Sequence, residues 1–318
     1  MQLLPPSATT LTGTSPYQKG WGRLALSLDV FRTPDERFDG LPGYALQPHY
    51  EEVDGLRLHY VDEGAGRPIV CFHGEPTWAY LYRKMVGPLV AGGHRVICPD
   101  YPGFGRSDKP TDRGWYTYDR HVEFVSGLLD QLDVREATVV VQDWGGPIGL
   151  RWAIENPDRV DRLVIMNTGL FAGQVNEAFM AWRNFAERNP DLPVGFVIKS
   201  ATATEVPDEV VNAYEAPWPN AESKAGVAMF PLLVPTTPDA PGAAEMRAVQ
   251  EQLAKWEQPA LVCFSDSDPI FTPKAGQRFV DLIPGAGDLR VIEGAAHFLQ
   301  EDRGEVIAGE INRFLDDG

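Results

Sequence analysis

Residues 137–146, ATVVVQDWGG, decide the fold of this 318-residue chain. The apolar, β-branched run ATVVV is typical of a strand buried on both faces of a parallel sheet, and Gly145 and Gly146 favour a sharp turn into a helix. Such a turn lifts the side chain of Asp143 clear of the sheet at its carboxyl edge, where α/β folds bind ligands. The pattern predicts a nucleophile elbow with an aspartate where a serine is usual, although Val141 is larger than the small residue expected there.

The same strand signal recurs along the chain and alternates with segments of helical periodicity at Tyr118 to Asp133 and Pro147 to Asn156. This alternation predicts an α/β fold with a mostly parallel, doubly wound sheet and crossover helices. The further runs expected to be buried strands are PIVCFHG (68–74), HRVICPD (94–100), DRLVIMN (161–167), PALVCFSD (259–266) and LRVIEG (289–294).

The alternation stops after Asn167, and no convincing buried strand follows until Pro259. We interpret residues 169–256 as a helical cap inserted into a core made of residues 26–168 and 257–318, with residues 1–25 as an N-terminal arm. The clearest cap helix runs through NEAFMAWRNFAERN (176–189), while the proline-rich stretches EAPWPN (215–220) and PLLVPTTPDAPG (231–242) are expected to be loops.

The composition of the chain limits which partners and which cellular compartment we expect. The chain is 43% apolar, which suffices for a sizeable core, and its net charge of −17 argues against nucleic acid or an anionic membrane surface as partner. No apolar run is long enough to span a membrane, and no signal peptide is recognisable. Cys71, Cys98 and Cys263 are odd in number and lie in apolar runs, so we expect buried thiols and a cytoplasmic protein.

An aspartate nucleophile needs partners, because the ester that it forms with a saturated carbon must be hydrolysed. A histidine that activates water, oriented by a second carboxylate, performs this step. The segment EGAAHFLQED (293–302) offers His297, and FSDSDPIF (264–271) offers two carboxylates. We favour Asp268, since the acid of α/β hydrolases commonly lies about three residues past the strand end, with Asp266 as second choice.

The loop after CFHG (71–74) completes the expected site. The backbone N–H groups of Glu75 and Trp144 are predicted to form an oxyanion hole, in which the side chain of Glu75 is secondary. His73 is expected to be a structural hydrogen-bonding residue beside that loop. The other histidines, His49, His59, His94 and His121, form no metal-ligand cluster, so we expect neither metal nor cofactor.

The joint pattern of HGEPTW (73–78), DYPGFGRSDKP (100–110), VQDWGGPIGLRWA (141–153) and AAHFLQED (295–302) resembles the haloalkane dehalogenases, from about Asp29 to the C-terminus. The resemblance implies hydrolysis of small apolar haloalkanes to alcohol and halide through a covalent ester on Asp143. It also implies that the indole N–H groups of Trp144 and Trp182 hold the departing halide. A sister subfamily has asparagine where Glu75 stands, and its acid where Asn167 and Thr168 stand.

Several alternatives remain open from the sequence. An epoxide hydrolase usually draws proton donors from two cap tyrosines, whereas Tyr214 is the only tyrosine between Gly169 and Lys255. Fluoroacetate dehalogenases carry arginine where Trp144 stands. A non-catalytic binding protein on the same fold is a further possibility. The side chains that either line a pocket or merely pack are Phe171, Phe179, Phe196 and Phe230, and the tryptophans interpreted as structural are Trp218 and Trp256.

Overall fold

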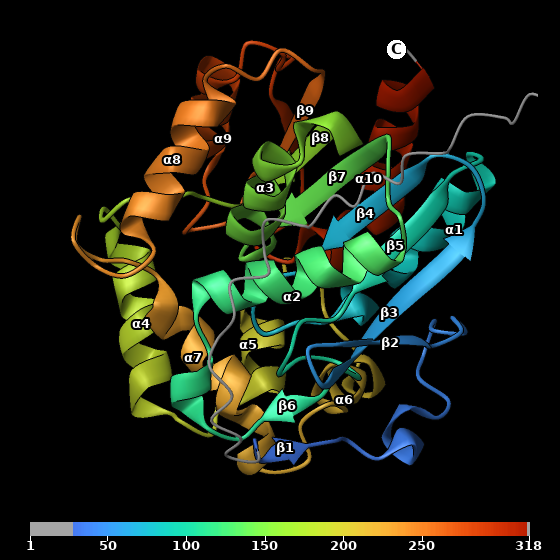
Figure 1. Cartoon of the computed structure of the whole chain (residues 1–318), viewed down its shortest axis with the longest axis vertical. Helices are drawn as coiled ribbons and strands as arrows, with labels where there is room; N and C mark the ends of the chain where they lie inside the picture. Colours follow the sequence, from blue (N-terminus) through green and yellow to red (C-terminus); the bar gives the residue numbers. More distant parts are fainter. Residues whose placement is uncertain (1–27, 317–318) are drawn as a thin grey trace, which may run out of the picture.

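A computed structural model describes residues 28–316, and the expected N-terminal arm, residues 1–25, lies outside the described residues. An eight-stranded sheet in the order β10-β9-β8-β7-β4-β5-β3-β2 forms its centre (Figure 1). The strands are β1 (Val30–Phe31), β2 (His49–Val53), β3 (Leu56–Gly64), β4 (Pro68–Phe72), β5 (Arg95–Pro99), β6 (Lys109–Pro110), β7 (Ala137–Gln142), β8 (Val160–Met166), β9 (Ala260–Ser265) and β10 (Arg290–Ile292), of which β1 and β6 pair separately.

The sheet is mostly parallel, as the sequence predicts. Strands β5, β4, β7, β8, β9 and β10 are parallel neighbours, and β3 runs against both β5 and β2. Every residue of β7 is buried, which agrees with its apolar run. The expectation of burial on both faces is wrong for β10, because this strand forms the sheet edge and Val291 is 46% exposed.

Strands β2 and β3 are absent from the sequence-based interpretation. They form a hairpin whose turn holds Asp54 at φ 44° and Gly55 at φ 82°. An Asp-Gly pair at positive φ is the favoured chemistry of a two-residue hairpin turn. The dipeptide was therefore the available signal for this hairpin.

The ten α-helices of the described residues cover the sheet and one of its ends. Figure 1 shows α2 and α3 in front of the sheet, with α10 behind it, where it packs on α1. The helices are α1 (Arg83–Ala91), α2 (Tyr118–Gln131), α3 (Gly145–Glu155), α4 (Glu177–Arg188), α5 (Val194–Ser200), α6 (Asp208–Glu215), α7 (Ala225–Leu233), α8 (Ala243–Leu253), α9 (Pro273–Leu282) and α10 (Leu299–Asp316). No helix between residues 28 and 316 is long and apolar enough to cross a bilayer.

Helices α4 to α8, which we call the inserted helices, lie between β8 and β9 in the chain. In Figure 1, α4, α5 and α7 lie on the side toward which the arrowheads of β4 and β7 point. Helix α4 matches the predicted helix at residues 176–189. The loop expected at residues 231–242 is wrong in its first part, since α7 continues to Leu233 with Pro231 inside it.

Asn176 ties the first inserted helix to the core. Its Oδ1 accepts a hydrogen bond of 2.8 Å from the N–H of Phe179, which satisfies a free donor at the start of α4. Its Nδ2 donates to the carbonyl oxygen of Ile270, 2.9 Å away, in the loop between β9 and α9. One side chain thus fixes the start of α4 against a loop of the core.

Candidate active site

Asp143 occupies the turn between β7 and α3 in a left-handed conformation, with φ of 50°. Few residues other than glycine adopt this conformation, and it persists only where neighbouring groups fix it. The N–H of Asp143 donates to the carbonyl oxygen of Asn167 at 2.9 Å, and its own carbonyl oxygen accepts from Gly146 at 2.9 Å. The turn therefore holds Asp143 at the carboxyl end of β7, in the geometry of a nucleophile elbow.

Glycines allow the backbone to approach closely around this turn. A Cβ on Gly74 would overlap the side chain of Asp143, and one on Gly146 would overlap the hydroxyl of Thr168. The larger residue at Val141 fits for a similar reason. Its Cγ1 lies 2.7 Å from the place where a Cβ on Gly149 would stand, so the glycine makes room for the valine.

Strand order brings Glu75 to Asp143. Strands β4 and β7 are neighbours, but the chain leaves β4 toward β5 on the other side, so their carboxyl ends flank a crevice. There the backbone N–H of Glu75 donates a hydrogen bond of 2.7 Å to Oδ1 of Asp143. This N–H lies where charge would develop on the Asp143 oxygen.

His297 lies in the loop between β10 and α10, with its ring between two carboxylates. Its Nε2 is 3.7 Å from Oδ2 of Asp143, and its Nδ1 is 2.8 Å from Oδ2 of Asp268. The other oxygen of Asp268 accepts from the N–H groups of Ile270 at 2.8 Å and Phe271 at 3.0 Å. The structure thus brings together Asp143, His297 and Asp268.

Asp266, the second choice for the acid, lies outside this arrangement. Its side chain is exposed and accepts from the N–H groups of Gly294 at 3.0 Å and Ala295 at 3.3 Å. These bonds steady the loop that leads to His297, and they leave Asp266 without contact to the imidazole.

Asn167 is a positioning residue that the sequence-based interpretation missed. Its Nδ2 donates to Oδ2 of Asp268 at 3.1 Å and to Oγ of Ser265 at 2.7 Å, while its Oδ1 accepts from the N–H of Ser265. The amide also lies 3.1 Å from the carbonyl oxygen of Ala296, next to His297. An asparagine at the end of the strand beside the nucleophile strand was the available signal.

Burial and neighbouring charge oppose each other at these three residues. Burial raises the pKa of Asp143 above its usual value, although the charge of His297 and the N–H groups of Glu75 and Trp144 pull it down. Burial lowers the pKa of His297, but the charge and hydrogen bond of Asp268, followed by the charge of Asp143, raise it overall. Burial also raises the pKa of Asp268, yet His297 holds it below its usual value.

A cavity of about 20 Å³ adjoins Asp143. Its wall includes Trp144, which follows the nucleophile, and Trp182 from α4. Neither indole N–H donates to another group within the described part of the chain. Apart from Asp143 and Glu75 the lining is apolar or aromatic, and it consists of Trp144, Pro147, Phe171, Phe179, Trp182, Val234 and Phe271.

The other candidate aromatics lie elsewhere. The indole N–H of Trp218 donates to the carbonyl oxygen of Gly103 at 3.0 Å, and Trp256 does not line the cavity. Phe230 stacks on Trp144 with ring centroids 4.9 Å apart, whereas Phe196 is 62% exposed.

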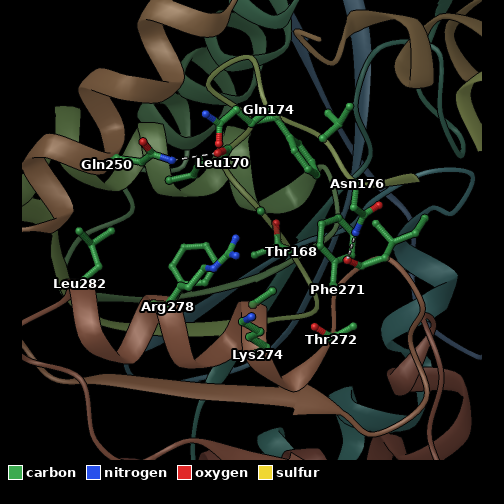
Figure 2. Close-up of a pocket in the computed structure, with 16 residues that line it drawn as sticks. Thr168, Leu170, Gln174, Asn176, Gln250, Phe271, Thr272, Lys274, Arg278 and Leu282 are labelled. Carbon is green, nitrogen blue, oxygen red and sulfur yellow. Dashed lines mark hydrogen bonds between the residues drawn. The ribbon is translucent and has the colours of Figure 1, made fainter. Parts of the chain in front are cut away.

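A second, open pocket of about 430 Å³ lies on the other side of Phe171 and Phe271, which line both spaces. The rings of these two residues lie 5.9 Å apart. Figure 2 shows Lys274 and Arg278 of α9 in this outer pocket, together with Gln174. The two phenylalanines therefore form the wall that the small cavity shares with the open pocket.

The remaining polar candidates are structural. His73 Nδ1 lies 2.9 Å from the carbonyl oxygen of Gly74, as expected of a residue that supports the loop. His121 is buried, and neither of its ring nitrogens has a hydrogen-bond partner inside residues 28–316. Within that range, no group of three or more histidine, cysteine, aspartate or glutamate side chains is arranged to hold a metal ion.

Tyr214 points away from the cavity. Its hydroxyl donates to Oε2 of Glu301 at 2.7 Å, and the guanidinium of Arg83 donates to the same carboxylate at 2.7 and 2.8 Å. Tyr214 is fully buried and absent from the cavity wall. It joins α6 to α1 and α10 as part of a buried ion pair.

Comparison with known proteins places this geometry in a family. The model of the alpha/beta hydrolase fold matches residues 67–304. A haloalkane dehalogenase of Psychrobacter cryohalolentis is 47% identical over 302 residues, covering 91% of this chain and 99% of the relative. Haloalkane dehalogenase 1 of Mycobacterium tuberculosis is 48% identical over 291 residues, covering 88% of this chain and 97% of the relative.

Solved structures agree with these sequence comparisons. The haloalkane dehalogenase DpaA of Paraglaciecola agarilytica, whose structure is described as tetrameric, superposes with a TM-score of 0.84 at 34% identity. The match covers 89% of this chain and 97% of DpaA. The chain therefore belongs to the haloalkane dehalogenases, a family with the α/β hydrolase fold.

Proposed function

We propose that this protein hydrolyses small apolar haloalkanes to an alcohol and a halide through a covalent ester on Asp143. The observation that carries the proposal is the alignment of Asp143, His297 and Asp268, with the N–H of Glu75 on the nucleophile and two unpaired indoles in the cavity beside it.

In the first half-reaction the carboxylate of Asp143 attacks the carbon that bears the halogen. The new C–O bond forms as the carbon–halogen bond breaks, and the halide leaves with the bonding electron pair. No proton moves in this step. The N–H of Glu75 holds Oδ1 of Asp143, which orients the free Oδ2 for in-line attack.

The indole N–H groups of Trp144 and Trp182 stabilise the departing halide. Indole is only a donor, so it binds an anion and cannot itself be alkylated as a carboxylate can. In an apolar cavity, hydrogen bonds to an anion are stronger than in water. These two residues thus act on the charge that the first step creates.

In the second half-reaction His297 removes a proton from water, which attacks the carbonyl carbon of the ester. The negative charge that develops on Oδ1 of Asp143 meets the N–H groups of Glu75 and Trp144. Collapse releases the alcohol and restores the carboxylate, and His297 passes its proton to solvent. Asp268 holds the imidazole by Nδ1, so that Nε2 faces Asp143.

Substrate entry requires that the wall of the cavity move. A space of about 20 Å³ holds about one water molecule, which is less than the volume of any haloalkane. Phe171 and Phe271 form the wall that the cavity shares with the outer pocket, so rotation of these rings is the shortest opening. Phe271 stacks on His297 at a ring distance of 5.7 Å and Phe171 stacks on Phe179 at 5.2 Å, so rotation of either ring breaks a ring contact.

An epoxide hydrolase is the runner-up, and the position of Tyr214 argues against it. Opening an epoxide produces an alkoxide that needs an acidic donor. The hydroxyl of Tyr214 is bonded to Glu301, outside the cavity.

The deciding experiment measures bromide released from a short bromoalkane by the purified protein, beside diol formed from a styrene-type epoxide. Asp143→Ala is the blank for both reactions. We expect bromide release that disappears in the variant. Diol without bromide would reassign the protein to epoxide hydrolysis, and neither product would favour a binding protein without turnover.

A further inference from the structure

The residues on either side of His297 are both connected to the loop between α5 and α6, residues 201–207. The N–H of Phe298 donates directly to the carbonyl oxygen of Ala201, 3.2 Å away. The N–H of Ala296 donates to Oδ2 of Asp302 at 2.9 Å, and this carboxylate in turn binds the loop. The base of the candidate site is thus held from the inserted helices as well as from the core.

Asp302 is a buried carboxylate in the first turn of α10, and its oxygens bind two separate parts of the chain. Oδ1 accepts from the N–H of Thr204 at 2.8 Å and from its hydroxyl at 2.6 Å. The N–H of Ala203 lies 2.9 Å from Oδ2 and 3.1 Å from Oδ1. All these groups donate, as does the N–H of Ala296. The side chain therefore needs two acceptor oxygens to bind the loop and the residue before His297 at the same time.

The core holds the same stretch by other atoms. Asn167 donates to the carbonyl oxygen of Ala296 at 3.1 Å. The ring of His297 is held at Nδ1 by Asp268, 2.8 Å away. These contacts leave the backbone N–H groups on either side of the histidine to the α5–α6 loop. Release of that loop would therefore loosen His297 from one side only.

The nucleophile is held differently. Its N–H donates to the carbonyl oxygen of Asn167, and its own carbonyl oxygen accepts from Gly146. Its Oδ1 accepts from the N–H of Glu75. These three partners of Asp143 all belong to the core. A change in the seating of the α5–α6 loop should therefore affect His297 more than Asp143.

We propose that Asp302 is a positioning residue that couples the α5–α6 loop to His297, so that the imidazole is placed for ester hydrolysis when this loop is seated on the core. The proposal rests on the proposed dehalogenation. Asp302 does not line the small cavity, and it acts through the N–H of Ala296. Attack by Asp143 on the substrate does not need His297, so the effect of Asp302 falls on the second half-reaction.

Asp302→Asn tests this role, because it keeps the shape of the side chain but leaves one acceptor oxygen for donors from two parts of the chain. Either the loop or Ala296 then loses its bond. In rapid-mixing experiments with a short bromoalkane, we expect alkylation within about threefold of the parent. Ester hydrolysis should be slower by about 10- to 100-fold, as for a base displaced by up to about 1 Å. Intact mass spectrometry should then show ester accumulating at steady state.

Asp108→Asn is the matched control. Asp108 is also a buried carboxylate that accepts from a backbone N–H, that of Arg57 at 2.9 Å, and from the guanidinium of Arg32. Neither partner belongs to the α5–α6 loop or to the loop of His297. A general loss of stability lowers the fraction of folded enzyme and so reduces both half-reactions by the same factor. We therefore expect no accumulation of ester in this variant.

Thr204→Val tests the coupling from the side of the inserted helices. Thr204 is exposed, and valine keeps its shape and its N–H but removes the hydroxyl bond to Asp302. We expect ester hydrolysis to slow by about two- to fivefold, with alkylation unchanged. Adding the change to Asp302→Asn should slow hydrolysis no further, because the connection between the loop and Ala296 is then already broken.

Proton NMR of His297 gives a readout that does not depend on turnover. In the neutral imidazole, the Nδ1–H that is bonded to Asp268 exchanges with water only when this contact opens. We expect this exchange to be about tenfold or more faster in Asp302→Asn than in the parent. The exchange in Asp108→Asn should match that of the parent.

Four results would overturn the proposal. They are equal slowing of both half-reactions in Asp302→Asn, the same accumulation of ester in Asp108→Asn, parental hydrolysis in Thr204→Val, and unchanged exchange of the ring proton in Asp302→Asn. A parent that forms no ester would refute the dehalogenation, and the exchange comparison then decides the positioning role alone. Melting curves establish that each variant is folded at the temperature of the measurements.

Discussion

Asp268 Oδ2 lies 2.8 Å from Nδ1 of His297, although 29 residues separate the two in the chain. They meet because β9 and β10 are parallel neighbours, and the loop after each strand starts at the same edge of the sheet. The contact fixes which imidazole nitrogen carries the proton. It leaves Nε2 facing Asp143, where water must be activated.

Replacing Asp268 should therefore leave the imidazole of His297 in the site but no longer hold it in the orientation that activates water. We expect Asp268→Asn to lower kcat by about 10³ to 10⁴-fold, since the imidazole loses both its orientation and its charge partner. Asp266→Asn is the natural control, because Asp266 is exposed and bonded only to nearby loop atoms. Steady-state bromide release measures both, and an equal loss in the two variants would contradict the assignment of Asp268.

Removing the base should separate the two half-reactions. In His297→Gln, attack by Asp143 remains possible but the ester has no base to activate water. Intact mass spectrometry after treatment with a bromoalkane should show a protein heavier by one alkyl group, and peptide mapping should place it on Asp143. The double variant with Asp143→Ala should stay unmodified. An unmodified single variant, with substrate bound, would contradict covalent catalysis.

The pH dependence of ester hydrolysis should differ from the titration of the free protein. The negative charge of Asp143 contributes to the raised pKa of His297, and esterification removes that charge. Hydrolysis needs neutral His297, so its rate falls as pH drops through the lowered pKa of the ester form. We expect the midpoint from single-turnover kinetics to lie below the pKa of His297 measured by NMR in the free protein. Coincident values would speak against this coupling.

The two tryptophans of the cavity should bind halide. Trp182→Phe keeps the ring but removes the N–H, and we expect bromide affinity to fall by about 10- to 100-fold, as for loss of a hydrogen bond to a charged group. Trp256→Phe is the matched control, because Trp256 lies outside the cavity wall. Calorimetric titration with bromide compares the two, and an unchanged affinity in Trp182→Phe would remove this residue from the site.

The buried ion pair of Glu301 should contribute to stability. Burial raises the pKa of Glu301, but Arg83, Lys84 and Tyr214 together lower it to about 2. We expect Glu301→Gln to reduce the free energy of unfolding by about 3 to 5 kcal/mol at pH 7. The deficit should shrink as pH falls from 4.5 toward 2, where the parent carboxylate takes up its proton. Urea unfolding at several pH values checks this, with exposed Glu305→Gln as control.

The sequence predicted the elements that depend on short stretches of the chain, such as a buried strand followed by a turn. The buried run before Asp143 predicted β7, and the order of Asp143, Asp268 and His297 in the chain predicted which loops would meet. Strand exposure is set by neighbours rather than by composition, which is why β10 resembled a central strand. The hairpin at Asp54 and Gly55 was overlooked because it is not part of the alternation of parallel strands and helices.

The side chains of Glu75 and Asn167 were beyond the reach of such patterns. Whether a glutamate in a loop is solvated or buried depends on elements that converge from distant parts of the chain, here α3 and α4 against the end of β4. Asn167 likewise matters through contacts with Ser265, Asp268 and Ala296, all about 100 or more residues away. The burial of Glu75 and the contacts of Asn167 are therefore visible only in the folded arrangement.

Helices α4 to α8 form one insertion of the chain between Met166 and Ala260, so a change in them leaves the pairing of the central strands untouched. Strand register sets the positions of the residues that make and break bonds, so a shift of the strands would displace these residues and reduce activity. The inserted helices add no strand to the sheet, yet α4 supplies Trp182 and Phe179 to the cavity, and the residue after α7 supplies Val234. Substitutions in these helices can therefore change which substrates fit the cavity, while the residues that carry out the reaction stay where they are.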